Sequence, residues 1–349
     1  MAKKINLALQ GGGAHGAFAW GVLDRLLEGD EINIAGISGT SAGALNGAAV
    51  TAALSAIPGR AGREAARENL DYVWSQVGQV SDNRMVRWMT SMVPMPRGMQ
   101  RWAEMVSPVA WLEGFSRIFS PYDSGPFYTN PLSAIIREMP HPLDGHHATA
   151  PEFFVTATNV RTGRVRIFSG DEVSPEAVMA SGCLPTLFRA VEIDDPATGQ
   201  REAYWDGGYS GNPALFPLFD RRLPADIVIV TINPMVREAV PRTPVEIQDR
   251  INEISFNSSL LRELRAIQFM KRLEREGRLS GRGMKEPLIH MISDDNLMTS
   301  LGTRTKVMPR PGLLAQMKAA GRDAAQAFLD GDAQNIGKAD SVDLPRLYG

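Results

Sequence analysis

Two glycine-rich turns near the start of the chain constrain its fold most strongly. Residues 11–16 read Gly-Gly-Gly-Ala-His-Gly, and residues 39–43 read Gly-Thr-Ser-Ala-Gly. Each turn directly follows a short apolar run and directly precedes a segment with helical spacing. Repeated strand, turn and helix units predict a parallel sheet covered by helices, with both turns at the carboxyl edge of that sheet.

Later parts of the chain extend this pattern. Residues 59–67 look like a charged connection, and residues 245–278 and 313–329 have helical spacing. Further strand-like runs lie at residues 5–9, 32–37, 152–157, 165–168, 227–232 and 287–292. We predict an α/β fold, a three-layer α/β/α arrangement with a mostly parallel central sheet, a helical insertion and C-terminal helices.

The predicted insertion occupies about residues 80–125. Between residues 84 and 119 the chain carries six methionines and three tryptophans, with prolines between short helical pieces. Methionine suits surfaces that accommodate varied apolar ligands. Two interpretations stay open: a cap or lid that contacts acyl chains or a membrane, and an ordinary helical subdomain with its own core.

Composition narrows the class of protein. The chain has 349 residues and a formal net charge of −2, which gives no indication of a nucleic-acid partner. Its single cysteine, Cys183, cannot form an internal disulfide and fits a reducing compartment. The N-terminal apolar run is too short for a signal peptide, and no run approaches a membrane span. We expect a cytoplasmic protein, with peripheral membrane contact left open.

The second turn has the G-x-S-x-G form of a nucleophile elbow, in which Ser41 lies on a strained strand-to-helix turn. Gly39 and Gly43 keep its flanks small, since larger side chains there would clash. The alternative is an ordinary turn in which Ser41 caps the following helix.

The first turn also satisfies the G-x-G-x-x-G dinucleotide fingerprint through Gly11, Gly13 and Gly16. That reading requires an acidic residue at the end of the second strand, where this chain has none. An oxyanion hole suits the turn better, because the amides of Gly12 and Gly13 can point at a tetrahedral intermediate.

A serine hydrolase of the usual kind needs a histidine base, but none of the five histidines has an obvious triad setting. His15 lies in the first glycine turn itself. Asp206, followed by Gly207 and Gly208, offers a carboxylate that could act as the base. The alternative there is a plain Asp-Gly hairpin turn.

Taken in order, the glycine-rich loop, G-T-S-A-G and D-G-G resemble the motifs of the patatin-like phospholipases. Residues 180–185 (Ala-Ser-Gly-Cys-Leu-Pro) and the pair Asn212-Pro213 are similar to further blocks of that family. The resemblance implies a Ser–Asp dyad without a catalytic histidine, a metal or a cofactor. Ser41 would be acylated, Asp206 would be the base, and Gly11, Gly12 and Gly13 would form the oxyanion hole.

The resemblance also implies a division of the chain. Residues 1–235 would form the catalytic domain, and residues 236–349 a C-terminal helical region packed on it. One residue departs from the family pattern, because His15 stands where members usually have arginine or lysine. This departure leaves no fixed positive charge in the loop and would make activity depend on protonation of His15.

The expected function is a metal-independent acyl hydrolase or esterase acting on a lipid or ester substrate. Two alternatives stay open: an acyltransferase that uses the same acyl-enzyme, and a non-catalytic lipid-binding protein. The sequence leaves the acyl chain length, the head group and the oligomeric state undetermined.

Overall fold

The computed structural model describes residues 2–79, 120–123, 128–143, 150–278, 285–301, 303–306 and 309–347. Apart from residues 120–123, the predicted insertion lies outside these ranges.

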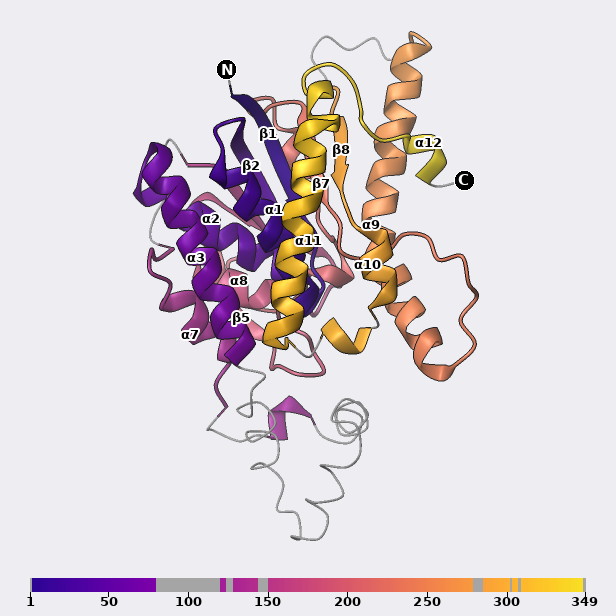
Figure 1. The fold of residues 1–349 in the computed structure, drawn as a ribbon. Coiled ribbons are helices and arrows are strands. Elements are labelled where there is room, and N and C mark those ends of the chain that lie inside the picture. The colour runs from indigo at the N-terminus through magenta and orange to yellow at the C-terminus, as the bar shows by residue number, and fades with distance from the viewer. Residues whose placement is uncertain are drawn as a thin grey trace.

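Within the described residues, eight strands form one sheet in the order β5-β6-β3-β2-β1-β7-β8, with β4 paired to β3 (Figure 1). Strand β1 is parallel to β2 and β7, β2 to β3, and β7 to β8, whereas β4, β5 and β6 pair antiparallel. The predicted mostly parallel sheet is confirmed. The strands are β1 Lys3–Leu9, β2 Ile32–Thr40, β3 Glu152–Asn159, β4 Val165–Ser169, β5 Val191–Asp195, β6 Gln200–Asp206, β7 Asp226–Val230 and β8 Leu288–Ile292.

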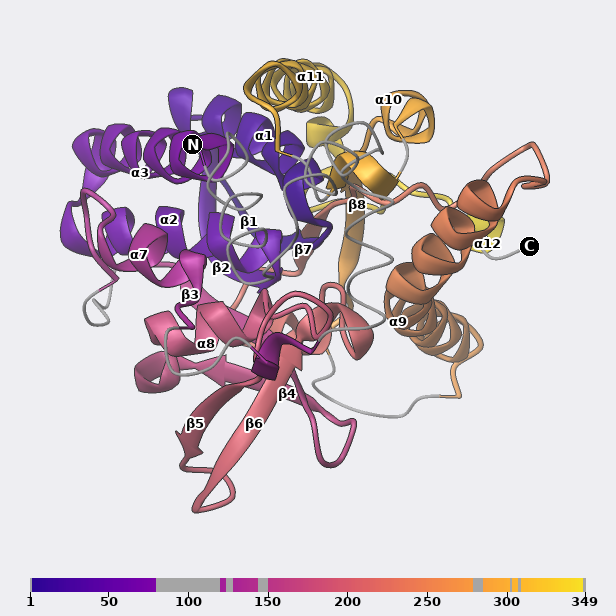
Figure 2. The ribbon, with the colours of Figure 1, turned by 90° about the horizontal axis from the view of Figure 1, so that it is seen from below.

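Helices cover both faces of the sheet, which gives the predicted three layers. Figure 2 shows α1, α2, α3 and α11 on one side and α9 on the other. The longer helices are α1 Gly16–Glu28, α2 Ala42–Ala56, α3 Gly59–Gln79, α9 Pro244–Arg275 and α11 Pro311–Asp330. The shorter ones are α7 Pro131–Arg137, α8 Pro175–Ser181, α10 Asp295–Ser300 and α12 Leu344–Leu347. None of the described helices is long and apolar enough to cross a bilayer.

Side chains of strand β1 pack into two separate hydrophobic cores. In β1, Leu7 and Leu9 join the core beneath α1, α2 and α11, whereas Ala8 joins the core beneath α9. This alternation is the period of two expected for a strand buried on both faces. Strand β8 extends the same sheet, so the core continues past residue 235.

Residues 59–67 correct one expectation, because they form the first half of helix α3 and not a connection. Arg60 and Glu64 lie on the outer face of an amphipathic helix, whose inner face buries Ala65, Ala66, Leu70 and Val73. The abundance of glycine and charge in this segment concealed the narrow apolar stripe.

Two glycines let α1 and α11 cross in backbone contact. A Cβ atom on Gly21 would lie 2.0 Å from the carbonyl oxygen of Lys318, and one on Gly321 would lie 2.0 Å from that of Phe18. Any side chain at either position would push the helices apart.

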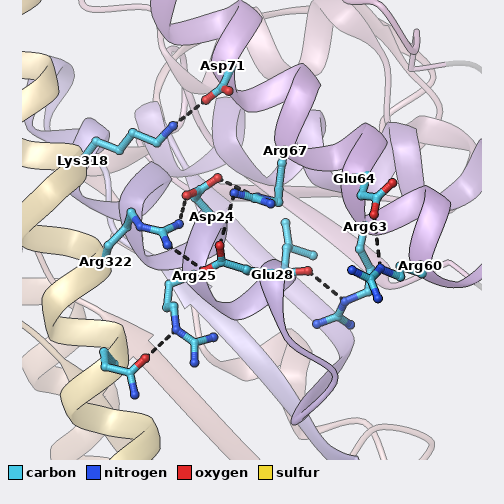
Figure 3. Close-up of polar contacts among 12 residues, drawn as sticks. Asp24, Arg25, Glu28, Arg60, Arg63, Glu64, Arg67, Asp71, Lys318 and Arg322 are labelled. Atoms are coloured by element: carbon cyan, nitrogen blue, oxygen red, sulfur yellow. Dashed lines mark hydrogen bonds and ion pairs between the residues drawn. The ribbon is translucent and has the colours of Figure 1, made fainter.

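A polar cluster fastens α1 to α3 and α11 beside this crossing (Figure 3). Asp24 of α1 is 2% exposed and accepts hydrogen bonds from Arg67 of α3 (2.8 Å) and from Arg322 of α11. Arg322 also binds Glu28 at 2.6 Å. Nearby, Arg63 donates to the carbonyl oxygens of Leu26, Leu27, Gly29 and Ile32. These contacts satisfy carbonyl groups at the end of α1 and at the start of β2.

Candidate active site

Ser41 lies on the sharp turn between β2 and α2. Its φ is 54° and its ψ is −121°, and no other non-glycine residue in the described ranges has a positive φ. A serine held in this conformation is strained, as in a nucleophile elbow. The Ser41 amide donates to the hydroxyl of Ser181, at the end of α8, over 2.8 Å. The sequence did not predict this contact.

The glycines that flank the serine are required by close backbone approach. A Cβ atom on Gly39 would lie 2.6 Å from the carbonyl oxygen of Gly43. One on Gly43 would lie 2.1 Å from the carbonyl oxygen of Leu9 in β1. Gly16 has a similar role, because its Cβ would lie 2.5 Å from that of Ala42. The two glycine turns therefore pack directly against each other.

Gly11 lies beside the serine but cannot serve as an oxyanion donor. A Cβ atom on Gly11 would lie 2.7 Å from the Cβ atom of Ser41. Its amide, however, donates to Oδ1 of Asn212 at 2.6 Å. Since this amide is occupied, the predicted set of donors is reduced to Gly12 and Gly13.

Gly12 and Gly13 supply the two remaining candidate amide donors. In the described part of the chain, neither amide has a hydrogen-bond partner. Gly12 is half-buried and Gly13 is exposed, with a φ of 60°. A Cβ atom on Gly13 would lie 2.3 Å from the carbonyl oxygen of Lys306, in the short helix η7 (Thr303–Lys306). Such free amides at the start of a helical turn suit an anionic oxygen.

Asp206 ends β6 at the same edge of the sheet, beside β3. Its carboxylate is 1% exposed and accepts the amide of Gly208 at 2.7 Å. The following turn is a short helix, η5 (Gly207–Tyr209), so the alternative of a hairpin turn is wrong. Gly207 must be small, because its Cβ atom would lie 2.2 Å from the carbonyl oxygen of Thr156 in β3.

The electrostatics of Asp206 suit a base. Desolvation by burial raises its pKa from 3.8 to about 6, although hydrogen bonds from the Gly208 amide and the Ser41 side chain partly oppose this. The structure thus places the predicted nucleophile close enough to the predicted base for the Ser41 side chain to affect the pKa of Asp206. A carboxylate with a pKa near 6 can accept a proton at neutral pH more readily than an ordinary one.

The chain matches the model of one known protein family. The family described as Patatin-like phospholipase matches residues 7–219, which is more than half of the chain and runs from within β1 past Asp206. The chain belongs to this family. Membership places it among hydrolases that act on the ester bonds of lipids. A comparison with functionally curated proteins gave no match.

Two solved structures are similar to this patatin-like chain at low identity. The crystal structure of VipD from Legionella pneumophila shares 16% identity over 94% of this chain and 67% of that chain, with a TM-score of 0.41. The structure of the heterodimeric ExoU-SpcU complex from the type III secretion system of Pseudomonas aeruginosa shares 17% identity over 97% of this chain and 61% of that chain. Its TM-score is 0.31. This patatin-like chain spans 67% and 61% of the lengths of these two chains.

A buried polar network that sequence analysis missed holds the glycine-rich loop of this patatin-like site. Oε1 of Gln10 accepts the amides of Ile232 (2.8 Å) and Asn233 (3.0 Å). Nε2 of Gln10 donates to Oδ1 of Asn257 in α9 at 2.8 Å. Asn233 in turn donates to the carbonyl oxygen of Gly11 at 3.0 Å. Helix α9 therefore supports the loop, although nothing in its sequence distinguishes Asn257 from other polar residues.

His15 does not behave as the sequence suggested. It is 1% exposed, and its Nε2 lies 2.6 Å from the hydroxyl of Thr305. Burial, with a further effect of the Lys306 charge, lowers its pKa to about 3. The imidazole therefore stays neutral across the physiological range. This lowered pKa argues against a dependence of activity on the protonation of His15.

Proposed function

We propose that this patatin-like protein hydrolyses carboxylic ester bonds of lipids through an acyl-enzyme, as a phospholipase A does. Ser41 is the nucleophile, Asp206 is the base, and the amides of Gly12 and Gly13 bind the oxyanion. The observation that carries the proposal is a serine in a strained turn beside a buried carboxylate of raised pKa.

In the first half-reaction, Oγ of Ser41 attacks the ester carbonyl carbon while Asp206 takes the hydroxyl proton. The carbonyl oxygen becomes an anion that accepts hydrogen bonds from Gly12 and Gly13. One such donor typically lowers the barrier by about 2.7–4 kcal/mol. Collapse of the intermediate breaks the bond to the leaving oxygen, which receives the proton from Asp206.

In the second half-reaction, Asp206 takes a proton from water, and the hydroxide attacks the acyl carbon. Collapse of this intermediate releases the fatty acid and returns the proton to Ser41. The same two groups serve both halves, so no histidine is needed. Cytoplasmic localisation and peripheral membrane contact stay predictions of the sequence.

A fluorophosphonate probe tests the nucleophile directly. We expect one covalent adduct on the wild type and none on Ser41→Ala. The matched control is Ser75→Ala, since Ser75 is an exposed serine of α3. Equal labelling of wild type and Ser41→Ala would overturn the assignment of Ser41, and no adduct on wild type would favour a non-catalytic lipid-binding protein.

Product analysis with a labelled phospholipid tests the reaction class. We expect the label in free fatty acid. Label transferred to an added alcohol or lysophospholipid in preference to water would instead identify an acyltransferase. Asp206→Asn should abolish turnover, whereas Asp194→Asn, on the exposed β5–β6 hairpin, should leave it unchanged.

A further inference from the structure

A lysine from the C-terminal part of the chain lies against the glycine-rich loop. The ammonium of Lys306 donates to Oδ1 of Asn233 at 2.5 Å, and Nδ2 of Asn233 donates to the carbonyl oxygen of Gly11. The Asn233 side chain also lies against Gly12, 3.6 Å from the position of a Cβ atom there. Backbone atoms of Lys306 pack on Gly13. A short series of contacts thus joins the Lys306 ammonium to the stretch of backbone that carries the free amides of Gly12 and Gly13.

The Lys306 ammonium has no carboxylate partner within 4.0 Å among the residues that the structure describes. Glu253 and Asp249 of α9 face it at longer range, as do Arg237 and the neutral His15. Glu253 is already bound by Arg237 (2.5 Å) and Arg250 (3.2 Å). Lys306 is half-buried, and no contacting carboxylate among the described residues neutralises its ammonium, so it keeps a positive charge beside the loop that can attract an anion.

We propose that Lys306 is a positioning residue of the oxyanion hole: held by Asn233, it orients the glycine loop and adds positive charge where the oxyanion develops. This inference rests on the proposed function. The anion that this charge would attract is the tetrahedral intermediate. The role of Lys306 also explains how the loop functions with the neutral His15, since the positive charge comes from η7, remote in sequence.

The proposal has a consequence for pH dependence. Burial lowers the pKa of Lys306 to about 8, although Glu253 and Asp249 partly oppose this. The ammonium loses its charge as the pH rises through that value. Activity should therefore fall above about pH 8, while protonation of Asp206 makes it fall below about pH 6.

Three proteins test the role: wild type, Lys306→Met and Lys306→Arg, with kcat and KM measured from pH 5 to 10 on a p-nitrophenyl ester. We expect kcat of Lys306→Met to fall about 10-fold with little change in KM, and the alkaline decline to vanish. Lys306→Arg should retain activity and move the decline to higher pH, because arginine stays protonated. Lys318→Met, at a half-buried lysine of α11 paired with Asp71, is the matched control.

Three results would overturn the proposal. The first is a wild type whose kcat does not fall at alkaline pH, or a Lys306→Arg variant whose kcat falls at the same pH as that of wild type. Either result would exclude a role for the charge of Lys306 in catalysis, and the comparison holds even if Lys306→Met fails to fold. Equal loss in Lys306→Met and Lys306→Arg would indicate packing alone. Loss confined to phosphatidylcholine micelles would assign the ammonium to the lipid phosphate. Failure of the proposed function itself is separate, since it would appear as fluorophosphonate labelling of Ser41→Ala.

Discussion

The side-chain amide of Asn212 binds the backbone of Gly11 at both ends. Its Oδ1 accepts the Gly11 amide at 2.6 Å, and its Nδ2 donates to the Gly11 carbonyl oxygen at 3.3 Å. Because a Cβ atom on Gly11 would touch that of Ser41, this pair sets the position of the loop against the nucleophile. The turn that carries the base is thereby tied to the turn that carries the oxyanion donors.

Asn212→Ala should release the loop. We expect kcat to fall 10- to 100-fold, since small displacements of catalytic groups have effects of this order. The free energy of unfolding should fall by about 2 kcal/mol, because the buried Gly11 amide loses its partner. Asn252→Ala, at an exposed hydrogen bond of α9, is the control. Steady-state kinetics and denaturant unfolding measure both effects; unchanged kcat in a destabilised Asn212→Ala would contradict the positioning role.

Asp206→Asn should be inactive but more stable at pH 8. Burial raises the pKa of Asp206 from 3.8, its ordinary value, to about 6 in the folded state. The folded state therefore favours the protonated carboxyl, and this contribution to stability is complete below pH 3.8 and is lost as the pH rises through 6. The difference corresponds to at most about 3 kcal/mol, which the neutral amide would recover. Thermal unfolding at pH 8 and pH 4 checks this, and a gain equal at both values would exclude ionisation as its cause.

Gly321→Ala should destabilise the fold without altering the chemistry of the site. Its Cβ atom would lie 2.0 Å from the carbonyl oxygen of Phe18, so α1 and α11 must separate. We expect a loss of about 1–3 kcal/mol in the free energy of unfolding. Gly312→Ala in the same helix has nothing within 4 Å and should be neutral or stabilising by up to about 1 kcal/mol. Similar melting temperatures for the two variants would refute the close crossing.

Asp24→Asn should weaken the contact of α1 with α3 and α11. Desolvation acts to raise the pKa of Asp24, but hydrogen bonds from Arg67 and Arg322 and the charge of Lys318 lower it overall. At pH values above the pKa that Asp24 has in the unfolded chain, the carboxylate therefore stabilises the fold. This stabilisation is lost as the pH falls through the lower pKa of the folded state. We expect a loss of about 2–4 kcal/mol at pH 7. Arg60→Ala, in an exposed pair with Glu64, should change stability by less than about 0.5 kcal/mol. Chemical denaturation at pH 7 measures both, and equal effects would contradict the role of the cluster.

The sequence was sufficient for the two strand–turn–helix units at the start of the chain and for the outline of the site. Glycine at 39 and 43 and the apolar runs before each turn predicted the elbow correctly, because close backbone approach and a strained φ restrict the residues that can stand there. Asp206 could be proposed because it ends a strand before two glycines. It was found by its local pattern and by the family resemblance together.

The supporting residues carried no such pattern. Asn212 could be noted only as part of an Asn-Pro pair, and Gln10, Asn233 and Asn257 only as ordinary polar residues. Each makes its contact with a segment distant in sequence. Helix α3 was missed for a related reason, since its apolar stripe gains meaning only where α1 and α2 cover it.

By itself the sequence determined the strand–turn–helix units, the elbow at Ser41 and the candidate base, because local sterics and periodicity act over a few residues. Only the tertiary structure decided which amides stay free, which carboxylate is buried enough to have a raised pKa, and which cation reaches the loop. Those properties depend on desolvation and on hydrogen-bond partners that folding brings from remote parts of the chain.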